Sequence, residues 1–296
     1  MEDPQWDAAD FSGMAERLYR YSELLASGAS REQVRRLAET SRLYRLSRSI
    51  YGRSPAQRLH LPAIFRRLPD TAVVGFYTGA QLHGFGDVRN RDVHVIVPAG
   101  ENVPHIRGVV AHEAVVPVGD PVFLGGVPCA PAARCAVDLA RLLRRMDAMP
   151  LLDLCLRVGA CQPEDLRSEV ARHERLRGVC QARQLIPLAD PRAECRQESQ
   201  LRLVLIDGGL PPPEPQIWVS DRDGVPLYRL DLGYRLRRVG VEYDGISHLD
   251  RTRLRHDRAR MNWLAANGWQ MRHFTDLDLY HRPAHIITTL TPLLRP

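Results

Sequence analysis

Two stretches, Arg-Leu-Asp-Leu-Gly-Tyr at 229–234 and Val-Gly-Val-Glu-Tyr-Asp-Gly at 239–245, decide the fold predicted for the C-terminal part of this chain. They read as two short strands joined by a basic turn at 235–238. Strands usually avoid acidic residues, yet Asp231 and Glu242 lie inside them. This placement therefore needs an explanation beyond strand formation.

Side chains alternate between the two faces of a strand. We therefore expect Asp231 on the face opposite to Leu230 and Leu232, and Glu242 on the same face as Asp244. A hairpin would bring these three carboxylates together, which is unfavourable unless a cation lies between them. Mg²⁺ (or Mn²⁺) takes oxygen ligands and needs only one or two carboxylates, so the pattern predicts a metal site at Asp231, Glu242 and Asp244. The alternative is an edge hairpin with a solvated acidic face.

Further motifs follow in a characteristic order. Gly245 and His248 come next, then a basic helix at 251–267, Gly-Trp at 268–269 and Arg-His-Phe-Thr at 272–275. This order resembles the PD-(D/E)XK nucleases, particularly the branch similar to very-short-patch-repair endonucleases. The resemblance implies a C-terminal restriction-endonuclease-like mixed sheet flanked by helices, with metal-dependent endonuclease activity that hydrolyses phosphodiester bonds.

The resemblance also implies roles for individual residues. Asp231, Glu242, Asp244 and His248 would be catalytic, and Glu198 matches the glutamate that the first helix of such nucleases directs to the metal site. An exposed glutamate favoured by the helix dipole is the alternative for Glu198.

The basic helix after the acidic strand offers phosphate contacts. Arg253, Arg255, Arg258 and Arg260 could contact phosphates, and of these Arg255 and Arg258 are assigned to DNA binding. The alternative is a solvated arginine face. Helical spacing places Asp257 on the core side, as a buried acid that is either paired with an arginine or part of the site.

One departure from the family pattern is the lack of lysine, because all 41 Lys+Arg residues are arginine. Asp244 stands where the lysine would be, and arginine cannot replace lysine as a base. His248 or a metal-bound hydroxide remains available for that role. The alternative function is a transcriptional regulator, or an antitoxin of a type IV toxin–antitoxin pair, whose nuclease-like fold is catalytically inactive.

The N-terminal segment predicts a winged helix-turn-helix. A helix at 21–28 ends at a glycine, a second helix starts with a capping box at Ser30 and Gln33, and two strands follow at 43–46 and 49–52. The second helix and the hairpin would bind DNA through Gln33, Arg35, Arg36, Thr40, Arg42, Arg45 and Arg48. The alternative is a small packing module with a solvated arginine face.

The runs Ser-Glu-Leu-Leu-Ala-Ser-Gly-Ala-Ser-Arg-Glu-Gln-Val-Arg-Arg-Leu at 22–37 and Leu-Tyr-Arg-Leu-Ser-Arg-Ser-Ile-Tyr-Gly at 43–52 resemble the N-terminal domain of AbiEi-type antitoxins. Such an antitoxin is the repressor of a type IV toxin–antitoxin pair. The resemblance implies DNA and a cognate toxin protein as partners.

The whole chain of 296 residues predicts an α/β (α+β) fold in three parts: 1–52, an α/β middle region 53–185 without an assigned role, and 190–296. A net charge of +6, carried by arginine, suits phosphate contact but does not require it. The six cysteines form no C-x-x-C pair, so a structural zinc site is not expected. No apolar run is long enough to span a membrane, and a cytoplasmic protein is predicted. The oligomeric state is left open.

Overall fold

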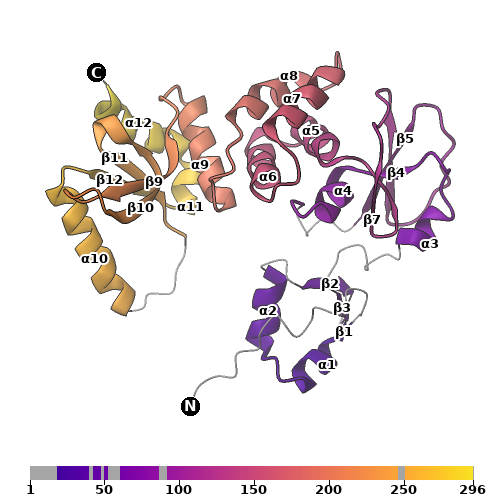
Figure 1. The fold of residues 1–296 in the computed structure, drawn as a ribbon, viewed down its shortest axis with the longest axis horizontal. Helices are drawn as coiled ribbons and strands as arrows, with labels where there is room; N and C mark the ends of the chain where they lie inside the picture. The colour runs from indigo at the N-terminus through magenta and orange to yellow at the C-terminus, as the bar shows by residue number, and fades with distance from the viewer. Residues whose placement is uncertain are drawn as a thin grey trace. The chain divides into compact units, whose positions relative to one another are not determined.

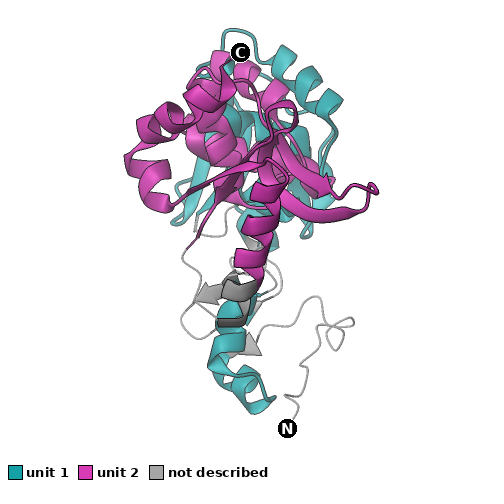
Figure 2. Cartoon of the chain, turned by 90° about the vertical axis from the view of Figure 1, so that its left-hand side faces the viewer, with its two compact units in different colours: residues 1–141, 160–179 teal, residues 142–159, 180–296 magenta. Residues whose placement is uncertain are grey.

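The computed structural model describes residues 19–39, 43–47, 50–52, 61–86, 92–245 and 251–295. The chain packs as two compact units, one of residues 1–141 and 160–179 and the other of residues 142–159 and 180–296 (Figure 2). Both units combine helices with β-sheets, so the predicted mixed α/β class is confirmed. In the part of the chain that is described, no helix is both long and apolar enough to cross a membrane.

The first unit begins with two short helices and a small sheet. Helix α1 (Tyr21–Ala26) and helix α2 (Arg31–Glu39) precede the antiparallel strands β2 (Tyr44–Ser47) and β3 (Ile50–Gly52), and β1 (Tyr19–Arg20) pairs with β3. The turn between the helices contains Gly28 with φ 97°, a left-handed conformation that favours glycine.

The capping box predicted at the start of α2 is confirmed. The Ser30 amide donates to Gln33 Oε1 at 2.7 Å, and the Gln33 amide donates to Ser30 Oγ at 3.1 Å. Both bonds satisfy amides that a helix start leaves without partners. Leu24, Val34 and Leu43 are buried together beneath the two helices.

The remainder of the first unit contains a five-stranded mixed sheet, whose strands β4, β5 and β7 are labelled in Figure 1. The strand order is β6-β5-β4-β8-β7. Its strands are β4 (Val73–Val74), β5 (Val93–Pro98), β6 (Val109–Ala114), β7 (Val122–Leu124) and β8 (Val127–Cys129). The helices of this part are α3 (Leu61–Phe65), α4 (Phe76–Leu82), α5 (Ala132–Leu142) and α7 (Pro163–Arg172). The β5–β6 and β4–β8 pairs are parallel, and the other pairs are antiparallel.

The second unit contains a four-stranded sheet in the order β12-β11-β10-β9. Its strands are β9 (Glu214–Ser220), β10 (Pro226–Tyr234), β11 (Val239–Tyr243) and β12 (Gln270–Phe274). Its helices are α6 (Arg145–Arg157), α8 (Val179–Leu185), α9 (Arg196–Asp207), α10 (Arg251–Ala266), α11 (Asp276–His281) and α12 (Pro283–Leu294), with 3₁₀ turns at Ile186–Leu188 and Arg235–Arg237. Strands β9, β10 and β11 are antiparallel neighbours, whereas β11 and β12 run parallel.

Helices cover both faces of this sheet (Figure 1). Leu201 of α9 and Ile286 of α12 are buried in one hydrophobic cluster, and Leu264 of α10 and Trp269 are buried in another. The predicted hairpin is therefore an internal part of a two-sided core rather than an exposed edge.

Strict alternation along β10 is wrong at one step. Leu230 packs with Leu264 in the cluster beside α10, whereas Leu232 packs with Leu201 in the cluster beside α9. Gln216 explains the break, because the β9–β10 register places it opposite Asp231 and its φ of 53° is left-handed. Such a conformation is uncommon outside glycine.

A buried ion pair joins α6 to α9. Arg202 Nη2 donates to Asp153 Oδ2 at 2.7 Å and to Oδ1 at 2.9 Å, and both side chains are at least 95% buried. The Asp190 amide also donates to Asp153 Oδ1, at 2.8 Å. Asp153 is thus a buried carboxylate that depends on its hydrogen-bond donors.

We predict that Arg202→Met lowers the free energy of unfolding by about 3–5 kcal/mol, because it leaves Asp153 buried without its cation. Urea denaturation of the full chain measures this. Arg183→Met, at an exposed position of α8, is the control and should change stability by less than about 0.5 kcal/mol. Adding Asp153→Asn to Arg202→Met should recover part of the loss. A loss no greater than that of the control would contradict the prediction.

Candidate functional site: a carboxylate cluster

Glu198 lies in the first turn of α9, and its side chain is buried, with 7% of the residue exposed. Its Oε2 accepts hydrogen bonds from the Glu194 amide and from Gln216 Nε2, both at 2.8 Å. The alternative of an exposed helix-start glutamate is therefore excluded. The left-handed Gln216 gives its side-chain amide to this carboxylate, so the strained position in β9 has a partner within the cluster.

Asp231 lies between two other carboxylates. Burial, together with the negative charges of Glu198 and Glu242, raises the pKa of Asp231 to about 6. The Tyr243 amide donates to Asp231 Oδ2 at 3.2 Å and opposes the shift. The β10–β11 register, continued by one residue, places Asp231 opposite Glu242. The predicted convergence of the two strands' acids is thus present.

Glu242 is 6% exposed and pairs with Arg260 of α10. Arg260 Nη1 donates to Glu242 Oε2 at 3.2 Å, while Nη2 contacts Oε1 and also donates to the Arg229 carbonyl oxygen at 2.8 Å. Arg260 was expected to contact phosphate. It instead neutralises the most buried strand carboxylate.

Asp244 follows β11 and is more exposed, with 57% of its side chain accessible. His273 of β12 lies next to it, with Nδ1 3.2 Å from Asp244 Oδ2 and 3.7 Å from Glu242 Oε2. From the sequence, His273 was expected only as part of the strand that follows Gly-Trp at 268–269. The parallel pairing of β11 with β12, which aligns Glu242 with His273, makes it a member of the site.

Other predicted site residues differ in how far the structure describes them. His248 lies outside the described residues. Arg258 is exposed on α10, and for Arg255 only the backbone of α10 is described. Asp257 was predicted as a buried acid and is exposed, so that prediction was wrong. The helical register points Asp257 to solvent and Arg260 to the sheet.

The N-terminal candidates are also only partly described. Arg35 and Arg36 are exposed on α2, and Arg35 Nη2 lies 3.8 Å from Glu32 Oε1. Gln33, predicted as a base contact, uses its side chain in the capping box. Thr40, Arg42 and Arg48 lie outside the described residues, and for Arg45 only the backbone of β2 is described. The DNA-binding roles of all these residues stay predictions.

The donor set of the cluster fits a hard divalent cation. Its four acids supply carboxylate oxygens, the ligands that Mg²⁺ and Mn²⁺ prefer. Burial and the neighbouring charges of Glu198 and Glu242 raise the pKa of Asp231, and the charge of Arg260 opposes this shift only in part. Asp231, Glu242, Asp244 and Glu198 are therefore the residues that would hold such an ion.

Comparison with known proteins places the middle of the chain in a known class. Residues 72–188 match the family model for the AbiEi antitoxin C-terminal domain. This supports the antitoxin part of the resemblance, and it falls on the region to which the sequence assigned no role.

Two proteins from Mycobacterium tuberculosis are similar to this chain over most of its length. They are the uncharacterized protein MT2308 (strain CDC 1551 / Oshkosh) and the uncharacterized protein Rv2248 (strain ATCC 25618 / H37Rv). Each is 33% identical over 216 residues, which cover 73% of this chain and 78% of the relative. The chain belongs to the same family as these two proteins. A solved structure, that of the RV2827C protein from Mycobacterium tuberculosis, is similar with 15% identity and a TM-score of 0.33, covering 63% of this chain and 78% of that one.

The raised pKa of Asp231 predicts a pH dependence of stability in the absence of divalent cations. The ordinary pKa of 3.8 rises to about 6 in the folded chain. The protonated group therefore contributes stability that is complete below pH 3.8 and is lost as the pH rises through about 6. Asp231→Asn should remove this loss, so its stability relative to wild type should rise by about 2–3 kcal/mol between those limits.

Urea denaturation in EDTA from pH 4 to pH 7 measures this difference. Asp223→Asn, an exposed acid in the β9–β10 turn, is the charge-matched control and should parallel wild type at every pH. A difference between Asp231→Asn and wild type that does not change with pH would contradict the assignment.

Proposed function

We propose that this chain is a DNA-binding regulator of the antitoxin class, in which the N-terminal helices bind DNA. The observation that carries this proposal is the match of residues 72–188 to the AbiEi antitoxin C-terminal domain, preceded by a helix pair with a capped second helix. The order α1, α2, β2, β3 supports the winged helix-turn-helix prediction, in which β2 and β3 would be the wing.

In this arrangement α2 enters the major groove, and the exposed Arg35 and Arg36 lie on it. Guanidinium groups bind phosphate bidentately, so these side chains suit backbone contacts that fix the register of the helix. A cognate toxin protein, encoded nearby, would be the partner whose expression such a regulator controls. We therefore expect the chain to bind the DNA upstream of its own gene.

The double variant Arg35→Ala/Arg36→Ala should weaken binding to this upstream duplex. Each lost phosphate contact should also reduce the slope of log K against log salt by about one. Fluorescence anisotropy at several salt concentrations measures both quantities. Arg167→Ala, at an exposed arginine of α7 that pairs with Glu164, is the control and should keep the wild-type slope. An unchanged slope in the double variant would rule out this surface of α2.

A second candidate function, metal-dependent hydrolysis of phosphodiester bonds, is favoured by a specific observation in the second unit. One helix and two strands bring together Glu198, Asp231 and Glu242. The charges of Glu198 and Glu242 contribute to the raised pKa of Asp231. The sequential order α9, β9, β10, β11, α10, β12 agrees with the restriction-endonuclease-like sheet flanked by helices that the motifs implied.

A bound Mg²⁺ or Mn²⁺ would polarise a phosphodiester oxygen and lower the pKa of a water molecule. Asp231 and Glu242 would hold the ion, with Asp244 and Glu198 beside them, and Gln216 fixes the orientation of Glu198. His273, next to Asp244, is placed to accept or hold a proton at Nδ1, a role that the missing lysine leaves open. His248 remains a candidate for the same role. Arg258 and Arg255 on α10 would contact phosphates.

The two candidate functions make different demands on the ion pair between Arg260 and Glu242. While Arg260 pairs with Glu242, one ligand of the predicted ion is already neutralised by protein. Release of Glu242 from Arg260 is therefore a requirement of hydrolysis, whereas a purely binding module can keep the pair.

Nicking of supercoiled plasmid tests hydrolysis. We expect the full chain to nick plasmid with Mn²⁺ or Mg²⁺. EDTA should abolish nicking because it removes the cation, and Asp231→Asn and Glu242→Gln should abolish it because each replaces a carboxylate ligand by a neutral amide. Asp223→Asn is the matched control and should nick at the wild-type rate. Nicking that survives both site substitutions would assign the activity elsewhere. If no metal supports nicking while binding to the upstream DNA is intact, hydrolysis is excluded and the regulator function is the one that remains.

A further inference from the structure

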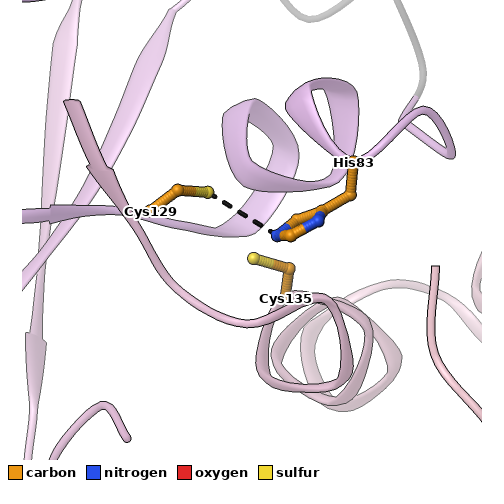
Figure 3. A group of neighbouring side chains, drawn as sticks. All are labelled: His83, Cys129 and Cys135. Carbon is orange, nitrogen blue, oxygen red and sulfur yellow. Dashed lines mark hydrogen bonds between the residues drawn. The ribbon is translucent and has the colours of Figure 1, made fainter. Parts of the chain in front are cut away.

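A second cluster of metal-ligating side chains lies in the first unit, inside the region that matches the antitoxin domain (Figure 3). His83 follows helix α4, Cys129 ends strand β8, and Cys135 lies in helix α5. One ligand atom from each residue lies within 4.8 Å of the other two. Both cysteines are fully buried, and His83 is partly buried.

The backbone leaves room for the two sulfur atoms. Gly79 lies one helical turn before His83, and a Cβ atom there would be 2.4 Å from Cys135 Sγ and 3.6 Å from Cys129 Sγ. The first distance is shorter than any normal contact, so α4 accommodates Cys135 only because residue 79 has no side chain. The thiols thus occupy a space that the helix sequence keeps open for them.

The three groups converge on one backbone oxygen. The Ala130 carbonyl oxygen lies 2.8 Å from His83 Nε2, 3.4 Å from Cys129 Sγ and 3.6 Å from Cys135 Sγ. A thiol is a weak donor, so two thiols and an imidazole around one carbonyl form a poor hydrogen-bond network. The same atoms are good ligands of a soft or borderline cation once the thiols and the imidazole nitrogen lose their protons.

We propose that His83, Cys129 and Cys135 bind a thiophilic transition-metal ion, with Zn²⁺ as the ion of choice. In a tetrahedral zinc site, a thiolate sulfur and an imidazole nitrogen are about 3.6 Å apart, given the usual Zn–S and Zn–N bond lengths. Cys129 Sγ and His83 Nε2 are 3.8 Å apart, so little movement is needed to bind an ion between them. The Ala130 carbonyl oxygen or a water molecule completes the fourth position.

A metal ion at this cluster would be bound by the thiolate form of the two cysteines. An ion here would tie α4, β8 and α5 together, so its role in the antitoxin-like region would be to hold these three elements in place.

Metal binding by the full-length protein tests the proposal. After treatment with chelator and desalting, the chain is titrated with Co²⁺ as a spectroscopic probe and then with Zn²⁺ as a competitor. We expect thiolate-to-cobalt charge-transfer absorption at one ion per chain, which Zn²⁺ abolishes. Cys129→Ser and Cys135→Ser should weaken binding by at least about tenfold, an effect seen even when a residue only orients a ligand. Cys180→Ser, at an exposed cysteine, is the matched control and should bind as wild type does.

The charge-transfer band separates this cluster from the carboxylate cluster, because carboxylate oxygens give no such band. If a cysteine variant fails to fold, alkylation of the wild-type chain provides the second test. Zn²⁺ should protect Cys129 and Cys135 from alkylation in the native chain, and chelator should restore their reaction, while Cys180 reacts in both states. Equal reaction of Cys129 and Cys135 with and without Zn²⁺ would overturn the proposal. A Cys129–Cys135 disulfide in the isolated protein would overturn it in favour of a redox pair.

Discussion

The second unit is organised around the electrostatic cost of placing Asp231 between the buried carboxylates of Glu198 and Glu242. Removing carboxylates from water is expensive unless donors or cations compensate them. Glu198 is compensated by an amide from Gln216 and by the Glu194 backbone, and Glu242 is compensated by Arg260. The charge of Asp231 is less well compensated, because burial and the charges of Glu198 and Glu242 raise its pKa.

Local geometry follows from this constraint. Gln216 adopts a left-handed conformation that costs about 1–3 kcal/mol for a residue with a side chain. Its side-chain amide donates to Glu198, and the register places Gln216 opposite Asp231. At this step Leu230 and Leu232 fall into different hydrophobic clusters. Strain in β9 and the break in β10 are thus two consequences of one polar cluster inside a hydrophobic core.

Local signals in the sequence predicted local structure well. The hairpin and the capping box of α2 were predictable because each depends on neighbouring residues. Packing between distant segments was not readable. Arg260 and His273 join the carboxylates only through the docking of α10 and β12, and Asp257 faces solvent because of how α10 is rotated. His83, Cys129 and Cys135 were missed for the same reason, since they share no C-x-x-C spacing and meet only through tertiary contacts.

The two candidate functions differ in the partner that they give to Glu242. A regulator of the antitoxin class can keep Arg260 on Glu242 permanently, so the cluster then serves only the structure of the second unit. A hydrolase must exchange Arg260 for a divalent cation, because both compete for the same carboxylate oxygens. The match of residues 72–188 to the antitoxin domain favours the first, and the raised pKa of Asp231 among the other carboxylates favours the second.

Anomalous diffraction from crystals of the full-length protein grown with Mn²⁺ tests the cation site most directly. The account predicts a peak about 2–2.5 Å from carboxylate oxygens of Asp231 and Glu242, with Arg260 displaced from Glu242. Density without a peak at these carboxylates, with Arg260 still paired to Glu242 at saturating Mn²⁺, would contradict it.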